Sequence, residues 1–269
     1  MLQDSDLGEV TAYMSGPARI LWERSFPGVI LESNFSSVLE KTNTVITGTG
    51  WSSDVEHVAR LEARMRGIYS IAVLDHWINY VERFVRDGKA LFPDEIWVVD
   101  EYALKLAHGS FPTQKIRIFP DSYANRLVRT VAPISSIIGN SLLYLLEPIR
   151  SDWGRGELGE FQALKYFLKR LPQLGLPEDT VIKLRPHPSD VTGKYDSFLT
   201  TQGPYKVFLA TDELSRELSN ARWAAGCQTY AMTLAIKAGR MVFCSLPPWA
   251  PECVLPHEGV IHVKNWSAT

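Results

Sequence analysis

The chain has 269 residues, of which 45% are hydrophobic and 22% are charged, and its formal net charge is -2. This composition is typical of a globular protein that forms one large domain or two medium ones. The charge provides no basic field for holding a nucleic acid, and no apolar run approaches the roughly 20 residues of a membrane span. We therefore expect neither a nucleic acid partner nor a membrane-spanning segment.

The N-terminal sequence MLQDSDLGEV lacks the pattern of a secretory signal peptide. The three cysteines, Cys227, Cys244 and Cys253, are an odd number without metal-type spacing, and the six histidines show no ligand spacing either. We expect free thiols, a cytoplasmic location, and neither a metal ion nor a cofactor.

The first half of the chain begins its regular pattern at Thr44–Thr47 (TVIT), an apolar run typical of a buried strand. The glycine-rich loop Gly48, Thr49 and Gly50 follows, and residues 55–67 then have a helical period. Such a loop would direct backbone N–H groups at a bound anion, whereas a simple tight turn is the alternative. The loop has neither the GK[ST] of a Walker motif nor a full GxGxxG signature.

The alternation of strands and helices continues to about residue 131. Tyr69–Leu74 is the next predicted strand, and residues 79–84 have a helical period. Strands are also predicted at Pro93–Asp100 and Lys115–Phe119, with a helix after each. This order is typical of a parallel, doubly wound sheet.

The same pattern restarts after residues 132–140, which are the best linker candidate. Strands are predicted at 141–146, 181–184, 205–210 and 241–245, and helices at 159–170, 214–218 and 231–238; the run 260–263 follows without an assignment. The sequence therefore predicts an α/β fold of two Rossmann-like domains with parallel sheets, over residues 1–135 and 136–269.

The most informative stretch is Val181–Asp190, VIKLRPHPSD. Two prolines cannot continue a strand ladder, so the chain must leave the sheet with His187 on a stiff loop between Pro186 and Pro188. Ligands bind beyond the carboxyl ends of strands in open α/β sheets, and Arg185 with His187 suits a phosphate there. A rigid turn with a solvated arginine and a surface histidine is the alternative.

Three other loops of the second half follow predicted strands and should meet the same edge. Gln228, Thr229 and Tyr230 precede a helix, so Thr229 can cap it while the first N–H groups face an anion. Glu147 and the proline-rich loop that contains Trp249 can bind a base or a ribose. Each residue also has a structural interpretation, as a helix cap, a surface acid or a packing ring.

The first half offers carboxylates for catalysis. Asp75 ends the strand that is expected to be central, and it can take a proton from an acceptor hydroxyl or attack a donor carbon. Asp54 and Glu56 are further candidates, although both are also explained as acids at a helix start.

The order Arg185-Pro186-His187-Pro188, Gln228-Thr229 and Pro247-Pro248-Trp249-Ala250 resembles that of capsule-type Kdo transferases, and the His-Pro motif also resembles that of bacterial sialyltransferases. The resemblance covers about residues 181–256. It implies a compact GT-B fold in which the His-Pro and Gln-Thr segments hold the phosphate of a CMP-activated sugar. It also implies an acid in the N-terminal domain, here Asp75, although the glycine of the usual Asp/Glu-Asp-Gly segment is missing.

These features predict a metal-independent glycosyltransferase that moves a nonulosonic or ulosonic acid (Kdo, sialic, legionaminic or pseudaminic acid) from CMP to a glycan or protein hydroxyl. The expected partners are a nucleotide-sugar donor and a glycan or protein acceptor, with peripheral membrane association or a homo-oligomer left open. The alternatives are a UDP-sugar transferase or epimerase of the same fold, and a non-catalytic nucleotide- or glycan-binding module of a surface-polysaccharide system.

Overall fold

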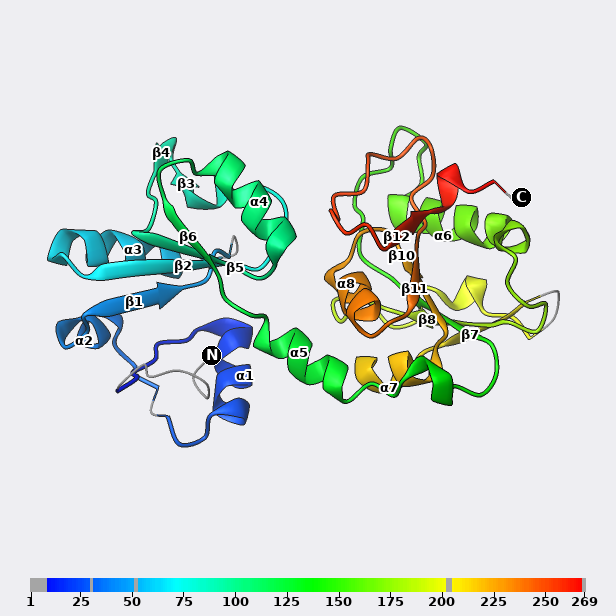
Figure 1. Cartoon of the computed structure of the whole chain (residues 1–269), viewed down its shortest axis with the longest axis horizontal. Coiled ribbons are helices and arrows are strands. Elements are labelled where there is room, and N and C mark those ends of the chain that lie inside the picture. The colour runs from blue at the N-terminus through cyan, green and yellow to red at the C-terminus, as the bar shows by residue number, and fades with distance from the viewer. Residues whose placement is uncertain (1–8, 30, 51–52, 202–204, 268–269) are drawn as a thin grey trace. The chain divides into compact units, whose positions relative to one another are not determined.

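The structure is a computed structural model that describes residues 9–29, 31–50, 53–201 and 205–267. The chain forms two compact units, residues 1–120 and 121–269 (Figure 1). Helix α5 (Ser122–Arg129) packs against α8 (Tyr230–Lys237) of the second unit. The sequence-based boundary at residue 135 therefore lies beyond a helix that belongs with the second unit.

The first unit contains a four-stranded parallel sheet with the order β1-β2-β5-β6. Its strands are β1 (Thr44–Thr47), β2 (Tyr69–Leu74), β5 (Glu95–Val98) and β6 (Lys115–Ile118), and its helices are α1 (Gly16–Ser25), α2 (Phe35–Glu40), α3 (Val55–Arg66) and α4 (Glu101–Ser110). A small hairpin of β3 (Val85–Arg86) and β4 (Lys89–Ala90) lies between β2 and β5 in the sequence. Strand β2 is interior, as predicted.

The helix predicted over residues 79–84 is not formed. Asn79 has a φ of 56°, in the left-handed region, and only a 3₁₀ turn forms at Glu82–Phe84. The apolar spacing that suggested a helix instead serves a ring cluster, in which Tyr80 and Phe84 both pack against Phe111 at centroid distances of 6.2 and 5.5 Å. Tertiary packing accounts for the pattern.

The second unit contains a six-stranded parallel sheet with the order β12-β11-β10-β7-β8-β9. Its strands are β7 (Ser141–Leu145), β8 (Val181–Arg185), β9 (Lys206–Leu209), β10 (Trp223–Gly226), β11 (Met241–Cys244) and β12 (Val260–His262). Counted from β7, this is the 3-2-1-4-5-6 order of a doubly wound dinucleotide-type fold. The direction of winding reverses between β7 and β10, which makes their carboxyl ends a topological switch point.

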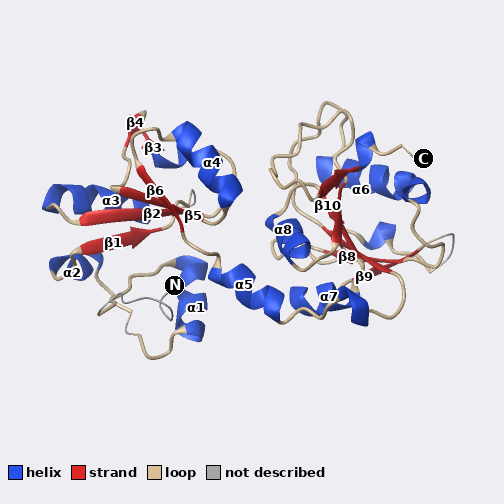
Figure 2. Ribbon diagram, in the orientation of Figure 1, coloured by secondary structure: helices blue, strands red, loops and turns tan. Residues whose placement is uncertain are grey.

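Helices cover both faces of this sheet, α6 (Gly159–Arg170) on one and α7 (Leu214–Asn220) with α8 on the other (Figure 2). Alternate residues of β7 show why both are needed. Leu142 and Tyr144 pack with Leu164 and Phe167 of α6, while Leu143 on the opposite face is equally buried. A central strand that is apolar on both faces is typical of a parallel sheet covered by two helix layers.

The predicted α/β fold of two Rossmann-like units with parallel sheets is confirmed. Within the described residues, none of the helices has the length and apolar character needed to cross a membrane.

Candidate functional site

The switch point of the second unit brings together two residues singled out from the sequence. Glu147 lies two residues after β7, and Gln228 lies two residues after β10. The backbone N–H of Gln228 donates a hydrogen bond of 3.1 Å to Oε1 of Glu147. A carboxylate therefore occupies the crevice in which this strand order places ligands.

Burial changes the acidity of this carboxylate. It raises the pKa of Glu147 to about 7, and the hydrogen bond from Gln228 opposes the shift only in part. Near neutral pH Glu147 is therefore divided between a form that can donate a hydrogen bond and one that only accepts. Either form suits a sugar hydroxyl, which is both donor and acceptor.

A group of thiols and hydroxyls lies beside Glu147, and the sequence did not predict it as a cluster. Cys244 Sγ lies 3.1 Å from the carbonyl oxygen of Cys227, and Cys227 Sγ lies 3.5 Å from Ser245 Oγ. Burial raises the pKa of the Cys227 thiol, which makes it a poor nucleophile. The hydrogen bond from Cys244 lowers the pKa of the partly exposed Cys253 to about 7. All three cysteines are free, as expected.

The His-Pro loop leaves the sheet at the end of the neighbouring strand β8. The backbone N–H of His187 donates to Oδ2 of Asp190 at 2.8 Å. Its Nδ1 accepts from the N–H of Ser189 at 3.2 Å, and the Ser189 hydroxyl lies 2.7 Å away. This pattern assigns the proton of the neutral ring to Nε2, which can then donate to a ligand.

One lysine connects this loop with the segment after β7. Nζ of Lys194 lies 2.5 Å from Oδ1 of Asp190 and 2.6 Å from Oε1 of Glu160, both on nearly buried carboxylates. Oε2 of Glu160 accepts from the N–H of Ile149 at 2.7 Å. Burial opposes the charge of Lys194, but the two carboxylates outweigh it and raise its pKa. No sequence pattern marks this link, because Lys194 is far from Glu160 in the chain and forms an ordinary i, i+4 pair with Asp190.

The other predicted residues of this edge have different contacts. The guanidinium of Arg185 donates to the carbonyl of Asp212 at 2.6 Å, before α7. Thr229 occupies the N-cap position of α8, and its side chain makes no capping hydrogen bond. The hydroxyl of Tyr230 donates to the carboxylate of Asp121, which caps α5. Pro188 is exposed beside His187. Their roles in nucleotide binding stay predictions.

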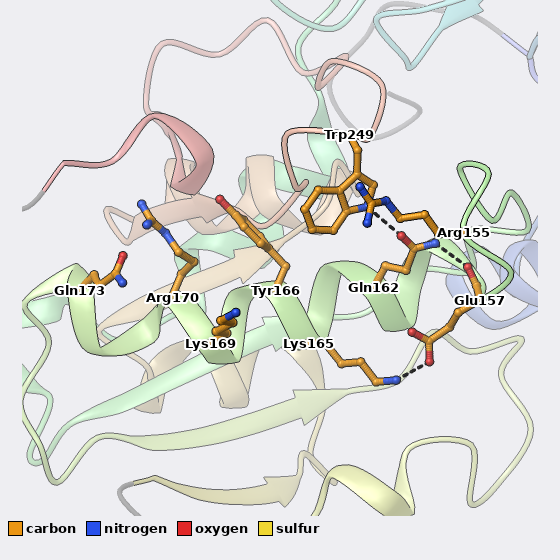
Figure 3. Close-up of a pocket in the computed structure, with 9 residues that line it drawn as sticks. All are labelled: Arg155, Glu157, Gln162, Lys165, Tyr166, Lys169, Arg170, Gln173 and Trp249. Atoms are coloured by element: carbon orange, nitrogen blue, oxygen red, sulfur yellow. Dashed lines mark hydrogen bonds and ion pairs between the residues drawn. The ribbon is translucent and has the colours of Figure 1, made fainter.

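Trp249 lies along α6, in a groove whose lining includes neither Glu147 nor Gln228 (Figure 3). Its indole Nε1 donates to Oε1 of Gln162 at 2.7 Å. The groove is thus a second feature of this unit, separate from the switch point in its lining residues.

The candidate carboxylates of the first unit differ in their surroundings. Asp75 directly follows β2 and is well exposed, with its Oδ1 3.9 Å from the ring of His76. Asp54 is paired with Arg86 at 3.0 Å. Glu56 accepts a hydrogen bond of 2.5 Å from the backbone N–H of Gly50. The side chains of Asp54 and Asp75 are both largely exposed, at 76% and 67%, but the carboxylate of Asp54 is already engaged by Arg86.

The loop of Gly48, Thr49 and Gly50 is held by charged side chains on both its donor and acceptor groups. Glu56 takes the place that was predicted for an external anion at Gly50, and a Cβ at Gly48 would collide with the same carboxylate. The three carbonyls accept, in chain order, from the guanidinium groups of Arg60, Arg83 and Arg86 at 3.1, 3.0 and 3.3 Å. Ligand binding by this loop stays a prediction.

Comparisons with known proteins give distant likenesses of fold. The sequence matches no family model and no curated protein. Two of the similar solved structures are the UDP-GlcNAc 2-epimerase of Methanocaldococcus jannaschii (TM-score 0.48, 14% identity, 76% of this chain and 61% of that one) and a putative UDP-N-acetylglucosamine 2-epimerase of Listeria monocytogenes (0.48, 18%, 75% and 56%). UGT89C1 of Arabidopsis thaliana, solved with UDP-L-rhamnose, is similar at a TM-score of 0.36 and 12% identity, over 71% of this chain and 51% of that one.

The chain thus spans less than two thirds of the length of the first two of these proteins.

Proposed function

We propose that the second unit binds a nucleotide-activated sugar at the switch point and that the protein transfers this sugar to a hydroxyl group. The observation that carries the proposal is the hydrogen-bonded pair of Glu147 and Gln228 between β7 and β10. The crevice beyond this reversal of strand order is where doubly wound sheets bind nucleotides.

Each group at the edge has a chemical task in this proposal. Glu147 binds ribose hydroxyls, for which a carboxyl group offers both acceptor and donor capacity. The Nε2–H of His187 and the N–H groups at the start of α8 hold the phosphate, with the helix dipole favouring its negative charge. When the sugar leaves, these donors stabilise the charge that develops on the phosphate oxygen.

The transfer step uses a carboxylate of the first unit, for which Asp75 is our choice. The acceptor hydroxyl gives its proton to Asp75 while its oxygen forms a bond with the anomeric carbon. The bond from that carbon to the phosphate oxygen breaks, and the electron pair leaves with the nucleotide. The position of Asp75 directly after interior strand β2 and the exposure of its carboxylate support this role.

The motif order of the sequence favours CMP as the nucleotide, with an ulosonic or nonulosonic acid as the sugar. Arg185 ends β8 and Pro186-His187-Pro188 follows it, while Gln228-Thr229 lies beyond β10; the two strands flank β7 in the sheet. A UDP-sugar transferase or epimerase and a non-catalytic binding module are the competing functions, and each predicts a different result in the following experiment.

Titration calorimetry with CMP and UDP on the full chain tests the proposal. CMP should bind, UDP should bind at least tenfold more weakly, and His187→Ala should weaken CMP binding or turnover by about 10²-fold, as expected for a contact to the leaving group. His108→Ala, which changes an exposed histidine of α4 in the first unit, is the matched control and should change neither CMP binding nor turnover. If neither nucleotide binds, the proposal is refuted. If UDP binds more tightly than CMP, the donor nucleotide is UDP and not CMP.

Catalysis is tested separately with Asp75→Asn. The variant should retain CMP binding and lose donor hydrolysis and transfer, because the nucleotide site lies in the other unit. If the wild-type protein binds CMP but turns over no CMP-sugar, the binding-module function is the correct one.

A further inference from the structure

The outer face of α6 carries a groove of about 580 Å³ that the proposed nucleotide site does not use (Figure 3). Residues of α6, the loop before it and Trp249 form its walls. Its volume lies within the range of small-molecule sites. We call it the α6 groove and define it by four basic and two aromatic side chains: Arg155, Lys165, Lys169, Arg170, Tyr166 and Trp249.

The two aromatic rings form a fixed corner. The hydrogen bond from Trp249 Nε1 to Gln162 sets the orientation of the indole. Trp249 is nevertheless 40% exposed. The ring of Tyr166 meets it almost at right angles, with centroids 5.7 Å apart and an interplanar angle of 77°. The part of this indole that the Arg155 guanidinium leaves uncovered offers an apolar wall for the C–H face of a sugar ring without further loss of side-chain freedom.

The loop before α6 is held in place by the same helix, so the groove does not depend on a ligand for its shape. The side-chain amide of Gln162 donates to the carbonyls of Asp152 and Glu157, both at 2.6 Å. Asp152 in turn accepts from the N–H groups of Gly154 and Gly156 at 2.9 and 3.1 Å. These bonds position the backbone that carries Arg155.

Positive charge is concentrated in the groove, although the whole chain has a net charge of -2. Lys165 is paired with Glu157, the one acid of the lining. The guanidinium of Arg155 lies 4.1 Å from the centroid of the Trp249 ring. Lys169 is exposed and has no ion pair or hydrogen bond to the side chains that the structure describes.

Arg170 completes the charge of the groove. One of its terminal nitrogens, Nη2, donates to the carbonyl of Trp266 at 2.8 Å, a neutral partner that leaves the charge uncompensated. Three cations, on Arg155, Lys169 and Arg170, thus line the groove without a carboxylate partner among the described residues. A ligand that fills the groove must supply the negative charge.

We propose that the α6 groove binds an oligosaccharide that carries carboxylate groups. The Trp249 and Tyr166 rings contact the sugar rings, and Arg155, Lys169 and Arg170 bind the carboxylates. A single-stranded nucleic acid would need a series of stacking platforms along its path, whereas the groove offers one corner. Lipid head groups would engage the cations alone and leave the recessed corner of Trp249 and Tyr166 unused. The proposal does not depend on nucleotide binding at Glu147.

Binding of tetragalacturonate to the full chain, measured by calorimetry at low ionic strength, tests the proposal. We expect saturable binding that weakens at least tenfold in Lys169→Glu and in Trp249→Ala, while Trp249→Phe retains most of it. Lys237→Glu changes an exposed lysine at the end of α8 and should bind as the wild type does. The fully methyl-esterified tetrasaccharide, which keeps the rings and loses the charges, should bind at least tenfold more weakly.

Three results would overturn the proposal. The first is that tetragalacturonate does not bind, and the second is that its methyl ester binds as tightly as the free acid. The third is that an eight-residue oligothymidylate or anionic vesicles bind more tightly than tetragalacturonate and are weakened equally by Lys169→Glu. Because Trp249→Ala removes packing as well as the ring, Lys169→Glu and Trp249→Phe are the decisive variants. The CMP titration in Lys169→Glu should match the wild type, which separates failure here from failure of the nucleotide site.

Discussion

The raised pKa of Glu147 gives the second unit a stability that falls as pH rises. The carboxyl ionises near 4.5 in the unfolded chain and near 7 in the folded protein. Between these values the folded protein keeps a proton that the unfolded chain has released, so the free energy of unfolding decreases through this window. Below pH 4.5 both states are protonated, and the cost of the charge is absent.

The magnitude follows from the shift. A change from 4.5 to about 7, at 1.36 kcal/mol for each pKa unit, corresponds to at most about 3 kcal/mol. Part of the Glu147 surface still reaches water, which makes this an upper value. Glu147→Gln has the same shape, keeps an oxygen to accept from Gln228, and cannot ionise. The variant should be more stable than the wild type by less than about 1 kcal/mol at pH 5 and by up to about 3 kcal/mol at pH 8.

Hydrogen exchange of the β7 and β10 amides, measured by mass spectrometry from pH 5 to pH 8, reports on this unit without requiring the whole chain to unfold in one step. Glu258→Gln, which changes an exposed acid of the same unit, is the control and should follow the wild type. If the difference in stability between wild type and Glu147→Gln does not grow with pH, the assignment of a buried, proton-holding carboxyl at the switch point is incorrect.

Three further predictions concern other charged groups and a thiol. Lys194→Met leaves its two buried carboxylate partners unpaired and should destabilise the second unit by about 3–5 kcal/mol in urea unfolding, whereas Lys165→Met, which breaks an exposed pair, should cost less than about 1 kcal/mol. Burial alone would raise the pKa of Glu95 in the first unit, but its hydrogen bonds and ion pairs lower this pKa to about 2. The ionised carboxylate therefore stabilises the folded state above pH 4.5, by at most about 3 kcal/mol. This contribution to the free energy of unfolding should be lost as pH falls toward 2, and Glu95→Gln should lack it at every pH. Iodoacetamide at pH 8 should label Cys253 before the two buried thiols. Cys244→Ala should slow the labelling of Cys253 at pH 7, because it removes the hydrogen bond that lowers the pKa of Cys253. Equal labelling rates in this variant and the wild type would contradict that cause.

Much of the fold could be predicted because local pattern and tertiary structure agree in the strands and in the longer helices. Strands β1 and β2 and helix α6 have the predicted bounds, and β8 is one residue longer than predicted. Each has a clear period or a clear stop, such as the prolines after β8. The failure at residues 79–84 is of the opposite kind, since the rings there follow a helical spacing but pack against Phe111, at the end of α4, from a loop.

The candidate site was predictable only where it follows from topology. Parallel strands bring their carboxyl ends to one edge, so Glu147 and Gln228 could be expected to meet there. The ion pair of Lys194 with Glu160 joins residues that are far apart in the chain, and no period or motif marks such a pair. The same holds for the guanidinium groups of Arg60, Arg83 and Arg86 on consecutive carbonyls of one loop. These contacts are set by the packed fold.

The connection made by Lys194 also bears on the free energy of ligand binding. Asp190 fixes the backbone of His187, and Glu160 fixes that of Ile149, so one ammonium group holds two loops in a single arrangement before any ligand binds. Ordering a flexible side chain on binding costs about 0.5–1.5 kcal/mol, and these loops have already met that cost on folding. A ligand that bridges His187 and the end of β7 therefore binds to loops that are already ordered. Little of its binding free energy is lost to the ordering of these loops.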